Sequence, residues 1–244
     1  ASDVYKRQGG DGIHSDGELT ISGNANIEIA QGGEGKSGGN GIYNKHGLTI
    51  KGTIGTAKGG AGIGGGNGIH SDDHLYIFGT AEGTAKIETA QGGSGQTAGG
   101  AGIYSKGDLN ITGGKIVNAK GGDGTVLGDS KGRNGIYSAK KLTIGTATIG
   151  NAQGGIGKTA GGNGIHSDSD LDISGKAFIQ NAKGGDSWVR GGDGIHSTGI
   201  LTIKDDATIQ KAQGGTSKSG GHGIYSKNNL AISQSCLLYT SPSP

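Results

Sequence analysis

The chain has 244 residues, of which 58 are glycine and only one is cysteine. Its formal net charge is +2 at pH 7, and so small a charge gives no basic field for nucleic acid or an anionic membrane. No apolar run approaches the roughly 18 residues of a membrane-spanning helix. We therefore expect no nucleic-acid partner and no membrane insertion.

The two ends of the chain differ from everything between them. Residues 1–8 read ASDVYKRQ and residues 236–244 read CLLYTSPSP. Asp3–Gln8 can be encoded by GATGTGTATAAGAGACAG and Cys236–Ser241 by TGTCTCTTATACACATCT, which are reverse complements displaced by one base. Both strings resemble a transposon-end adaptor of DNA libraries, read in its two orientations. We therefore expect both ends to be adaptor-derived and residues 9–235 to be a fragment of a longer native protein.

Between these ends the sequence repeats a unit of about thirty residues. Each unit reads roughly G-I-[HY]-S, then L-x-I, then I-x-x-A-[QK]-G-G, then a glycine-rich loop. The first motif places an isoleucine at Ile13, Ile42, Ile69, Ile103, Ile136, Ile165, Ile195 and Ile224. The second motif gives Leu19/Ile21, Leu48/Ile50, Leu75/Ile77, Leu109/Ile111, Leu142/Ile144, Leu171/Ile173, Leu201/Ile203 and Leu230/Ile232. The third gives Ile27, Ile54, Ile87, Ile116, Ile149, Ile179 and Ile209.

Apolar residues two apart have the period of a strand rather than a helix. Three short strands and a loop make one turn of a β-solenoid, in which stacked turns share one core. The six-residue period typical of left-handed β-helices is absent. We therefore predict an all-β, single-stranded, right-handed parallel β-helix of about eight rungs. Length varies in the glycine loops and in an insertion near Gly79–Thr84, as is usual for loops outside a core.

Alternation along the first strand sorts its side chains between core and surface. If the isoleucine of G-I-[HY]-S points inward, the next residue points outward and the serine points inward. Buried hydroxyls need partners, and we expect a hydroxyl or amide one rung away. The inward polar column is Ser15, Asn44, Ser71, Ser105, Ser138, Ser167, Ser197 and Ser226. The outward column is His14, Tyr43, His70, Tyr104, Tyr137, His166, His196 and Tyr225.

Polar residues at two further positions alternate from rung to rung. Two residues after the His/Tyr position, Asp16, Lys45, Asp72 and Lys106 predict an opposite-sign ladder, each pair contributing ~0.2–1 kcal/mol. The residue before each glycine pair alternates without exception: Gln31, Lys58, Gln91, Lys120, Gln153, Lys183 and Gln213. The true repeat is therefore expected to span two rungs.

The repeat is similar to a known pattern. The units GGNGIHSDSDLDISG (Gly161–Gly175) and GGAGIGGGNGIHSDDHLYI (Gly59–Ile77) resemble repeats of glycine-rich surface proteins of gut bacteria. They also resemble clostridial carbohydrate-binding β-helix domains, whose members bind acidic plant polysaccharide such as polygalacturonate. The resemblance covers all eight rungs and implies an extracellular or bacterial cell-surface location. It supplies no fixed motif that assigns site residues.

Short glycine motifs suggest nucleotide binding or calcium binding. Gly35-Lys36-Ser37 and Gly157-Lys158-Thr159 have the end of a phosphate loop, but that loop needs a glycine five residues earlier. Ala30 and Ala152 stand there instead, so we reject nucleotide binding. Calcium-binding nonapeptide repeats need an aspartate in turn after turn. Asp123 and Asp129 come near this pattern in a single loop, which leaves one structural calcium ion as the only cofactor to consider.

Carboxylates and histidines on the outer face raise the question of catalysis or metal binding. Asp168, Asp170 and Asp172 share an outer face, as do the calcium-holding carboxylates of β-helix lyases, yet Lys141 should stack beside Asp170 and neutralise it. The native arginines, Arg133 and Arg190, both lie in loops. His166 and His196 should lie about 5 Å apart on adjacent rungs. We expect them to be solvated rather than metal-bound, and we assign no catalytic residue.

The outward His/Tyr column is the predicted ligand-binding face. Its proposed contact residues are Tyr43, His70, Tyr104, Tyr137, His166, His196 and Tyr225, with adjacent Tyr104 and Tyr137 as the best platform for a sugar ring. The opposing interpretation is that the rings pack under the glycine loops and shield the sheet. The leading hypothesis is an extracellular module that binds polysaccharide or mediates adhesion. A structural stalk comes second, a β-helix polysaccharide lyase third and ice binding last. Unpaired end rungs also predict end-to-end self-association.

Overall fold

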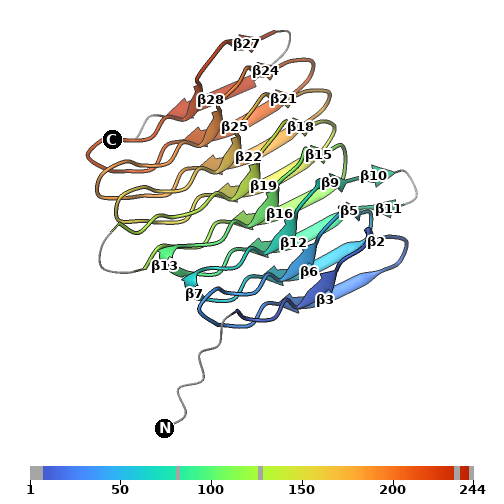
Figure 1. The fold of residues 1–244 in the computed structure, drawn as a ribbon. Coiled ribbons are helices and arrows are strands. Elements are labelled where there is room, and N and C mark those ends of the chain that lie inside the picture. Colours follow the sequence, from blue (N-terminus) through green and yellow to red (C-terminus); the bar gives the residue numbers. More distant parts are fainter. Residues whose placement is uncertain (1–7, 81–82, 126–128, 234–236, 242–244) are drawn as a thin grey trace.

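The computed structural model describes residues 8–80, 83–125, 129–233 and 237–241. They form strands and loops and contain no helix, so none of these residues forms a helix that spans a membrane. The chain winds into a column of stacked rungs (Figure 1), which confirms the predicted all-β parallel solenoid. Residues 1–7, 236 and 242–244 of the adaptor-like ends lie outside the described residues.

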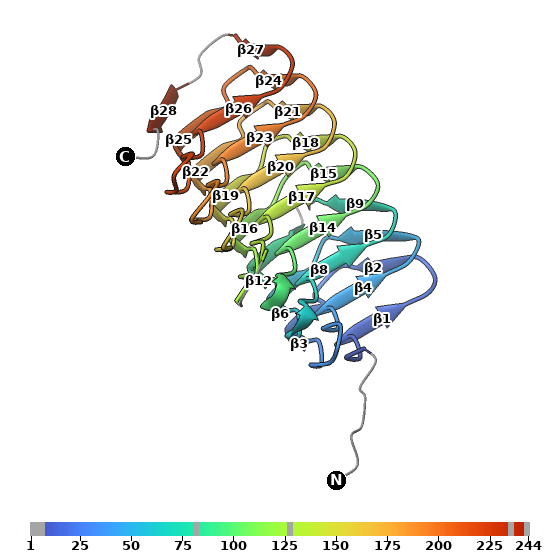
Figure 2. The same cartoon turned by 60° about the vertical axis from the view of Figure 1, so that its left-hand side comes forward.

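Three parallel sheets of eight strands run along the column (Figure 2). The first sheet contains β1 (Ile13–Ser15), β4 (Ile42–Asn44), β8 (Ile69–Ser71), β14 (Ile103–Ser105), β17 (Ile136–Ser138), β20 (Ile165–Ser167), β23 (Ile195–Ser197) and β26 (Ile224–Ser226). The second contains β2 (Leu19–Ile21), β5 (Gly47–Ile50), β9 (His74–Ile77), β15 (Leu109–Ile111), β18 (Leu142–Ile144), β21 (Leu171–Ile173), β24 (Leu201–Ile203) and β27 (Leu230–Ile232). The third contains β3 (Asn26–Gln31), β6 (Thr53–Lys58), β12 (Lys86–Gln91), β16 (Lys115–Lys120), β19 (Thr148–Gln153), β22 (Phe178–Lys183), β25 (Thr208–Gln213) and β28 (Leu237–Ser241).

Four short strands stand outside these sheets. In the insertion, β10 (Gly79–Thr80) pairs antiparallel with β11 (Gly83–Thr84). In the glycine loops, β7 (Gly62–Gly64) pairs with β13 (Gly95–Ala98). The third sheet also continues past the predicted domain boundary at residue 235, because β28 pairs with β25 in a shifted register.

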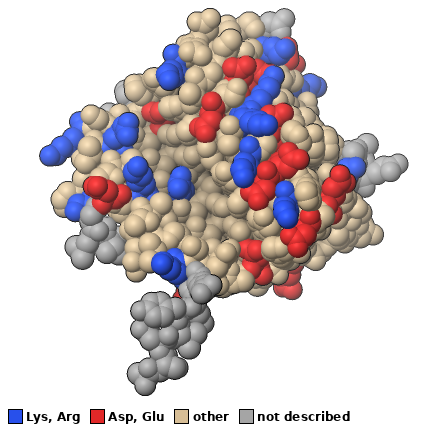
Figure 3. Space-filling view, viewed as in Figure 1, with Lys and Arg blue, Asp and Glu red and all other residues tan. Residues whose placement is uncertain are grey.

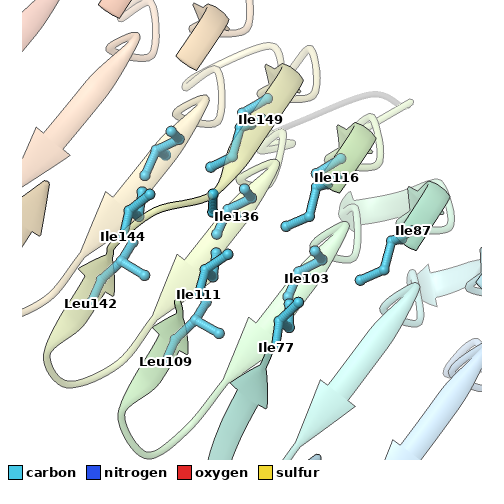
Figure 4. Close-up of a cluster of buried hydrophobic side chains, with 14 of the residues drawn as sticks. Ile77, Ile87, Ile103, Leu109, Ile111, Ile116, Ile136, Leu142, Ile144 and Ile149 are labelled. Carbon is cyan, nitrogen blue, oxygen red and sulfur yellow. The ribbon is translucent and has the colours of Figure 1, made fainter. Parts of the chain in front are cut away.

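The register between rungs follows the sequence repeat. Ile103 pairs with Ile136, and Leu109 pairs with Leu142. These columns point into one continuous core in which such side chains are fully buried (Figure 4). Burying one isoleucine or leucine contributes about 1.5–3 kcal/mol, and stacked rungs repeat this gain. A single rung would leave the same side chains in water, so the repeat is what makes the fold stable.

The inward serine column is buried as predicted, but its expected partners are wrong. Ser105 Oγ lies 2.9 Å from the carbonyl oxygen of Asp73 on the neighbouring rung and 3.0 Å from that of Asp108 on its own rung. Ser138 is placed in the same way against Gly107 and Lys141. The turn at this corner aims main-chain carbonyls at the hydroxyl, so each serine from Ser105 to Ser226 ties two turns together.

Each glycine-rich loop has an outgoing arm and a returning arm, and main-chain hydrogen bonds join the two. Gly60 N–H donates to Gly39 of the returning arm one rung below, at 2.8 Å. Gly66 N–H, in the returning arm, donates to Gly60 at 2.9 Å, and Gly93 N–H donates to Gly66 at 2.8 Å. We call this continuous path the glycine zigzag. Its outgoing residues are Gly33, Gly60, Gly93, Gly122, Gly155, Gly185 and Gly215, and its returning residues are Gly39, Gly66, Gly100, Arg133, Gly162, Gly192 and Gly221.

The glycine zigzag carries glycine at every position except Arg133, and glycine is required where its arms approach each other most closely. A Cβ atom on Gly66 would lie 1.9 Å from the carbonyl oxygen of Gly39, and one on Gly100 would lie 1.9 Å from that of Gly66. No side chain fits at such distances unless the main chain moves. The high glycine content therefore builds a packed loop layer rather than a flexible tail.

Candidate functional site

The His/Tyr column forms a continuous stack along the first sheet. Neighbouring ring centroids from His14 to Tyr225 are 4.5–5.3 Å apart. The structure thus brings all seven predicted contact residues into one row. The rings cover one another, however, and the side chains of His70 and His166 are only 18% and 17% exposed. Tyr104 and Tyr137 are tilted by 39° at 5.1 Å, so they do not form the flat, open platform that we expected.

A second polar column, which sequence reasoning missed, lies beside the rings. It occupies the variable position of G-G-x-G-I, and we call it the Asx ladder. Asn67 N–H donates to Asn40 Oδ1 at 2.9 Å, and Asp193 N–H donates to Asn163 Oδ1 at 2.6 Å. Its members are Asp11, Asn40, Asn67, Asn134, Asn163 and Asp193. The signal was present in the sequence, because this position is Asn or Asp in most repeats.

The Asx ladder sets the protonation of the histidines. Asn67 Nδ2 donates to His70 Nδ1 at 3.1 Å, and Asn163 Nδ2 donates to His166 Nδ1 at 3.0 Å. The proton of each neutral ring is therefore on Nε2, 3.2 Å from Asp72 and 3.1 Å from Asp168 respectively. Burial lowers the pKa of His70, and burial beside His196 lowers the pKa of His166 to about 4. Both rings are neutral at pH 7.

Aspartates of the histidine rungs also accept tyrosine hydroxyls from the rung before. Tyr43 donates to Asp72 at 2.7 Å, and Tyr137 donates to Asp168. Burial raises the pKa of Asp72, but the hydrogen bond from Tyr43 and the nearby His70 outweigh it and leave that pKa below its usual value. Lys106 Nζ lies 3.8 Å from Asp72. This is the one ion pair of the predicted Asp/Lys ladder within the described residues.

Three of these patterns depart from the repeat at one place: the Asx ladder, the tyrosine–aspartate bonds and the run of glycines in the glycine zigzag. Ala101 replaces the Asx residue, so it offers no side-chain oxygen to the main chain of the next rung. Ala139 stands where an aspartate would accept the Tyr104 hydroxyl, and that hydroxyl makes no hydrogen bond to any described residue. Arg133 replaces a glycine of the glycine zigzag; it is exposed and forms no ion pair within the described part of the chain.

A groove of about 370 Å³ opens at this interruption. We call it the Tyr104 groove, and its lining includes His70, Asp72, Ala101, Tyr104, Lys106, Arg133 and Tyr137. Two cations face one carboxylate there, so the groove is positive overall. Burial raises the pKa of Tyr104, which keeps its hydroxyl protonated and able to donate at neutral pH. The two tyrosines were predicted contact residues, whereas Ala101 and Arg133 were not.

The remaining predicted polar clusters are occupied by internal contacts. Lys141 lies beside Asp170 in the register, as predicted, but its ion pair is with Asp172, at 2.6 Å, and the Asp172 carboxylate raises the pKa of Lys141. Asp170 instead accepts the main-chain N–H of Ile200 at 2.8 Å. Asp123, one of the two predicted calcium ligands, accepts a main-chain N–H at 2.7 Å.

The histidine pair is engaged in the same way. The ring centroids of His166 and His196 are 4.5 Å apart, close to the predicted spacing. His166 accepts from Asn163, however, and His196 Nδ1 lies 2.7 Å from Asp193. No cluster of three or more metal-ligating side chains occurs among the described residues.

The fold and the Tyr104 groove are the features that bear on function. No family model matches the chain, and neither a curated protein nor a solved structure matches it.

Proposed function

We propose that the protein is an extracellular bacterial repeat module that binds an acidic polysaccharide through the His/Tyr face, centred on the Tyr104 groove. One observation carries this proposal: an arginine and a tyrosine hydroxyl, both without a partner among the described residues, line the same groove. Elsewhere along the face, the hydroxyls of Tyr43 and Tyr137 donate hydrogen bonds to aspartates of the protein itself.

The groove matches the chemistry of an acidic sugar. A guanidinium binds a carboxylate through two parallel hydrogen bonds, and Arg133 is free to do so. The Tyr104 hydroxyl can donate to or accept from a sugar hydroxyl. The missing side chain at Ala101 leaves room for the sugar, and the partly exposed rings of His70 and Tyr137 offer apolar contact. Lys106 adds a second positive charge at the rim.

A structural stalk is the second candidate, and one observation favours it. The glycine zigzag and the serine column tie each rung to the next along the described chain. Such a column is stiff along its axis. A stalk function, however, does not require the departure from the repeat at the Tyr104 groove. Ligand binding at this groove would therefore favour the binding module, and its absence would favour the stalk.

The test is calorimetric titration of the full chain with polygalacturonate and with a neutral galactan. Arg133→Gly restores the glycine of the repeat and should fold normally. Arg190→Gly is the matched control, because it removes the same charge from another loop. We expect polygalacturonate to bind, Arg133→Gly to weaken binding at least tenfold, and Arg190→Gly to leave it unchanged. Equal loss in both variants, equal binding of the neutral polymer, or no binding at all would overturn the proposal.

A further inference from the structure

A second row of polar side chains lies along the outer face of the third sheet, at the ends of its strands. At the end of each third-sheet strand from β3 to β25, the outward residue alternates between glutamine and lysine. The register places Lys58 between Gln31 and Gln91, and Lys120 between Gln91 and Gln153. Rungs are ~4.8 Å apart, so the lysines recur every ~10 Å along the axis.

The seven side chains of this row differ from the other polar columns in their bonding. None of them hydrogen-bonds or forms an ion pair with another described residue, whereas the serine column and the Asx ladder are bonded nearly throughout. Keeping like charges apart explains why lysine does not follow lysine. It does not explain glutamine, because any small polar residue would serve that purpose. The amide adds a donor and an acceptor at every second rung.

A groove runs beside this row. It has a volume of about 450 Å³ and is lined by Gln31, Lys58, Gln91 and Lys120, by two carboxylates, Glu34 and Asp123, and by glycine pairs that form its floor. A neighbouring hollow of about 490 Å³ continues it past Ser94. Substitution of the floor glycines by larger residues would cause a clash, since a Cβ atom on Gly59 or Gly92 would lie 1.9 Å from a carbonyl oxygen. Figure 3 shows this side of the molecule, with both basic and acidic side chains beside an uncharged, hollowed centre.

We propose that the Gln/Lys groove is a second binding site, which takes a linear polysaccharide lying along the solenoid axis with acidic and neutral sugars in alternation. If each rung holds one sugar, successive lysines lie beside every second sugar. Each lysine can then pair with the carboxylate of the sugar beside it. Each glutamine meets a neutral sugar, whose hydroxyl or N-acetyl group can exchange hydrogen bonds with the amide. The flat glycine floor lets the polymer lie close to the main chain.

Linear polymers of different chemistry fit this row less well. A nucleic acid carries a phosphate at every unit, so half of its charges would face glutamine. An extended peptide would need an open strand edge for its main-chain bonds, and the edges within the third sheet are paired. The two-rung period matches a polymer whose chemical repeat is two sugars.

The experiment uses the full chain and three probes. Hyaluronan alternates glucuronate with N-acetylglucosamine, polygalacturonate is acidic at every sugar, and chitin oligosaccharides are uncharged. The test variant is Lys58→Gln with Lys120→Gln. The control is Lys115→Gln with Lys176→Gln, which removes the same charge from exposed positions elsewhere. Circular dichroism verifies that every variant is folded.

We expect hyaluronan to bind, the test pair to weaken that binding at least tenfold, and the control pair to change it less than twofold. Gln91→Lys should move preference from hyaluronan toward polygalacturonate. In a parent that already carries Arg133→Gly, the test pair should still weaken hyaluronan binding at least tenfold, which separates this site from the Tyr104 groove. Absence of hyaluronan binding, equal loss in both lysine pairs, or no effect of the test pair in the Arg133→Gly parent would overturn the inference.

Discussion

The hydroxyl of Tyr43 donates to the carboxylate of Asp72 on the next rung, at 2.7 Å. The same bond joins Tyr137 to Asp168. A tyrosine rung is thus followed by a histidine rung whose aspartate receives the hydroxyl. This geometry gives a physical reason for the aspartate two residues after His70 and after His166, each on a rung that follows a tyrosine rung, whereas His196 follows a histidine rung and has Thr198 there.

The Tyr43–Asp72 bond should contribute measurably to stability. Tyr43→Phe is expected to lower the free energy of unfolding by about 1 kcal/mol, because a hydrogen bond to a charged acceptor is lost at a partly exposed site. Tyr104→Phe, whose hydroxyl has no partner among the described residues, should change it by less than about 0.5 kcal/mol. Urea denaturation at pH 7 measures both. Equal effects would contradict the assignment.

The same bond predicts an alkaline transition. Hydrogen bonding to Asp72 raises the pKa of Tyr43 to about 12 in the folded protein, from an ordinary value of 10. The folded state therefore holds its proton more tightly than the unfolded state does. The stabilisation is complete below pH 10 and is lost as the pH rises toward 12. A titration followed by tyrosinate absorbance measures this. Compared with the parent protein, Tyr43→Phe should have one tyrosine fewer that ionises above pH 10.

The neutral state of His166 makes the fold sensitive to acid. Its pKa is about 4 when folded and 6.5 when unfolded, so the unfolded chain binds the extra proton between these values. The contribution of His166 is present above pH 6.5 and is lost as the pH falls toward 4, by up to about 3 kcal/mol. Urea denaturation from pH 7 to pH 4.5 measures the loss. His166→Tyr uses the other residue type of this column and should flatten the slope; an unchanged slope would refute the assignment.

Replacing a glycine of the glycine zigzag should be severe. Gly66→Ala places a methyl group 1.9 Å from the carbonyl oxygen of Gly39, and the required shift of the main chain should cost about 3 kcal/mol or more. Gly47→Ala is the control, since its methyl group would meet nothing within 4 Å, and its effect should stay within about 1 kcal/mol. Thermal and urea denaturation compare the two. Similar stabilities would show that the close contact is not real.

Repairing the Asx ladder should separate stability from binding. In Ala101→Asn, the new amide oxygen can accept the main-chain N–H of Asn134, which should stabilise the fold by about 1 kcal/mol. The same side chain fills the Tyr104 groove and should weaken acidic-polysaccharide binding at least tenfold. Denaturation and calorimetric titration follow the two effects. A stabilised variant that binds as well as the parent would place the ligand elsewhere.

The repeat predicted the fold well because it acts on every rung alike. Leu109 and Ile111 are two residues apart, and so are their counterparts on each neighbouring rung, which leaves a stacked parallel sheet as the arrangement that buries them all. The inward position of Ser105 follows from the same alternation. Its partner did not follow, because the course of the main chain at the corner, rather than side-chain spacing, decides which oxygen is nearest.

The candidate site was predictable only in part, since it arises where the repeat fails. The consensus points to the rings, and Tyr104 belongs to that consensus. The groove depends on Ala101, where the amide side chain of the consensus is missing, and on Arg133, which replaces a consensus glycine. A consensus sequence averaged over all repeats shows neither departure. Comparing each rung with the consensus, and asking whether departures fall on neighbouring rungs, would have found them.

The alternation of glutamine and lysine has a consequence for how such a chain can change in length. Removing the single rung that ends at Gln91 would bring Lys58 and Lys120 onto adjacent rungs, ~4.8 Å apart, where their charges repel. Removing two rungs restores the original order. We therefore expect this sequence to tolerate duplication and deletion better in steps of about sixty residues, which is two rungs, than in steps of one rung.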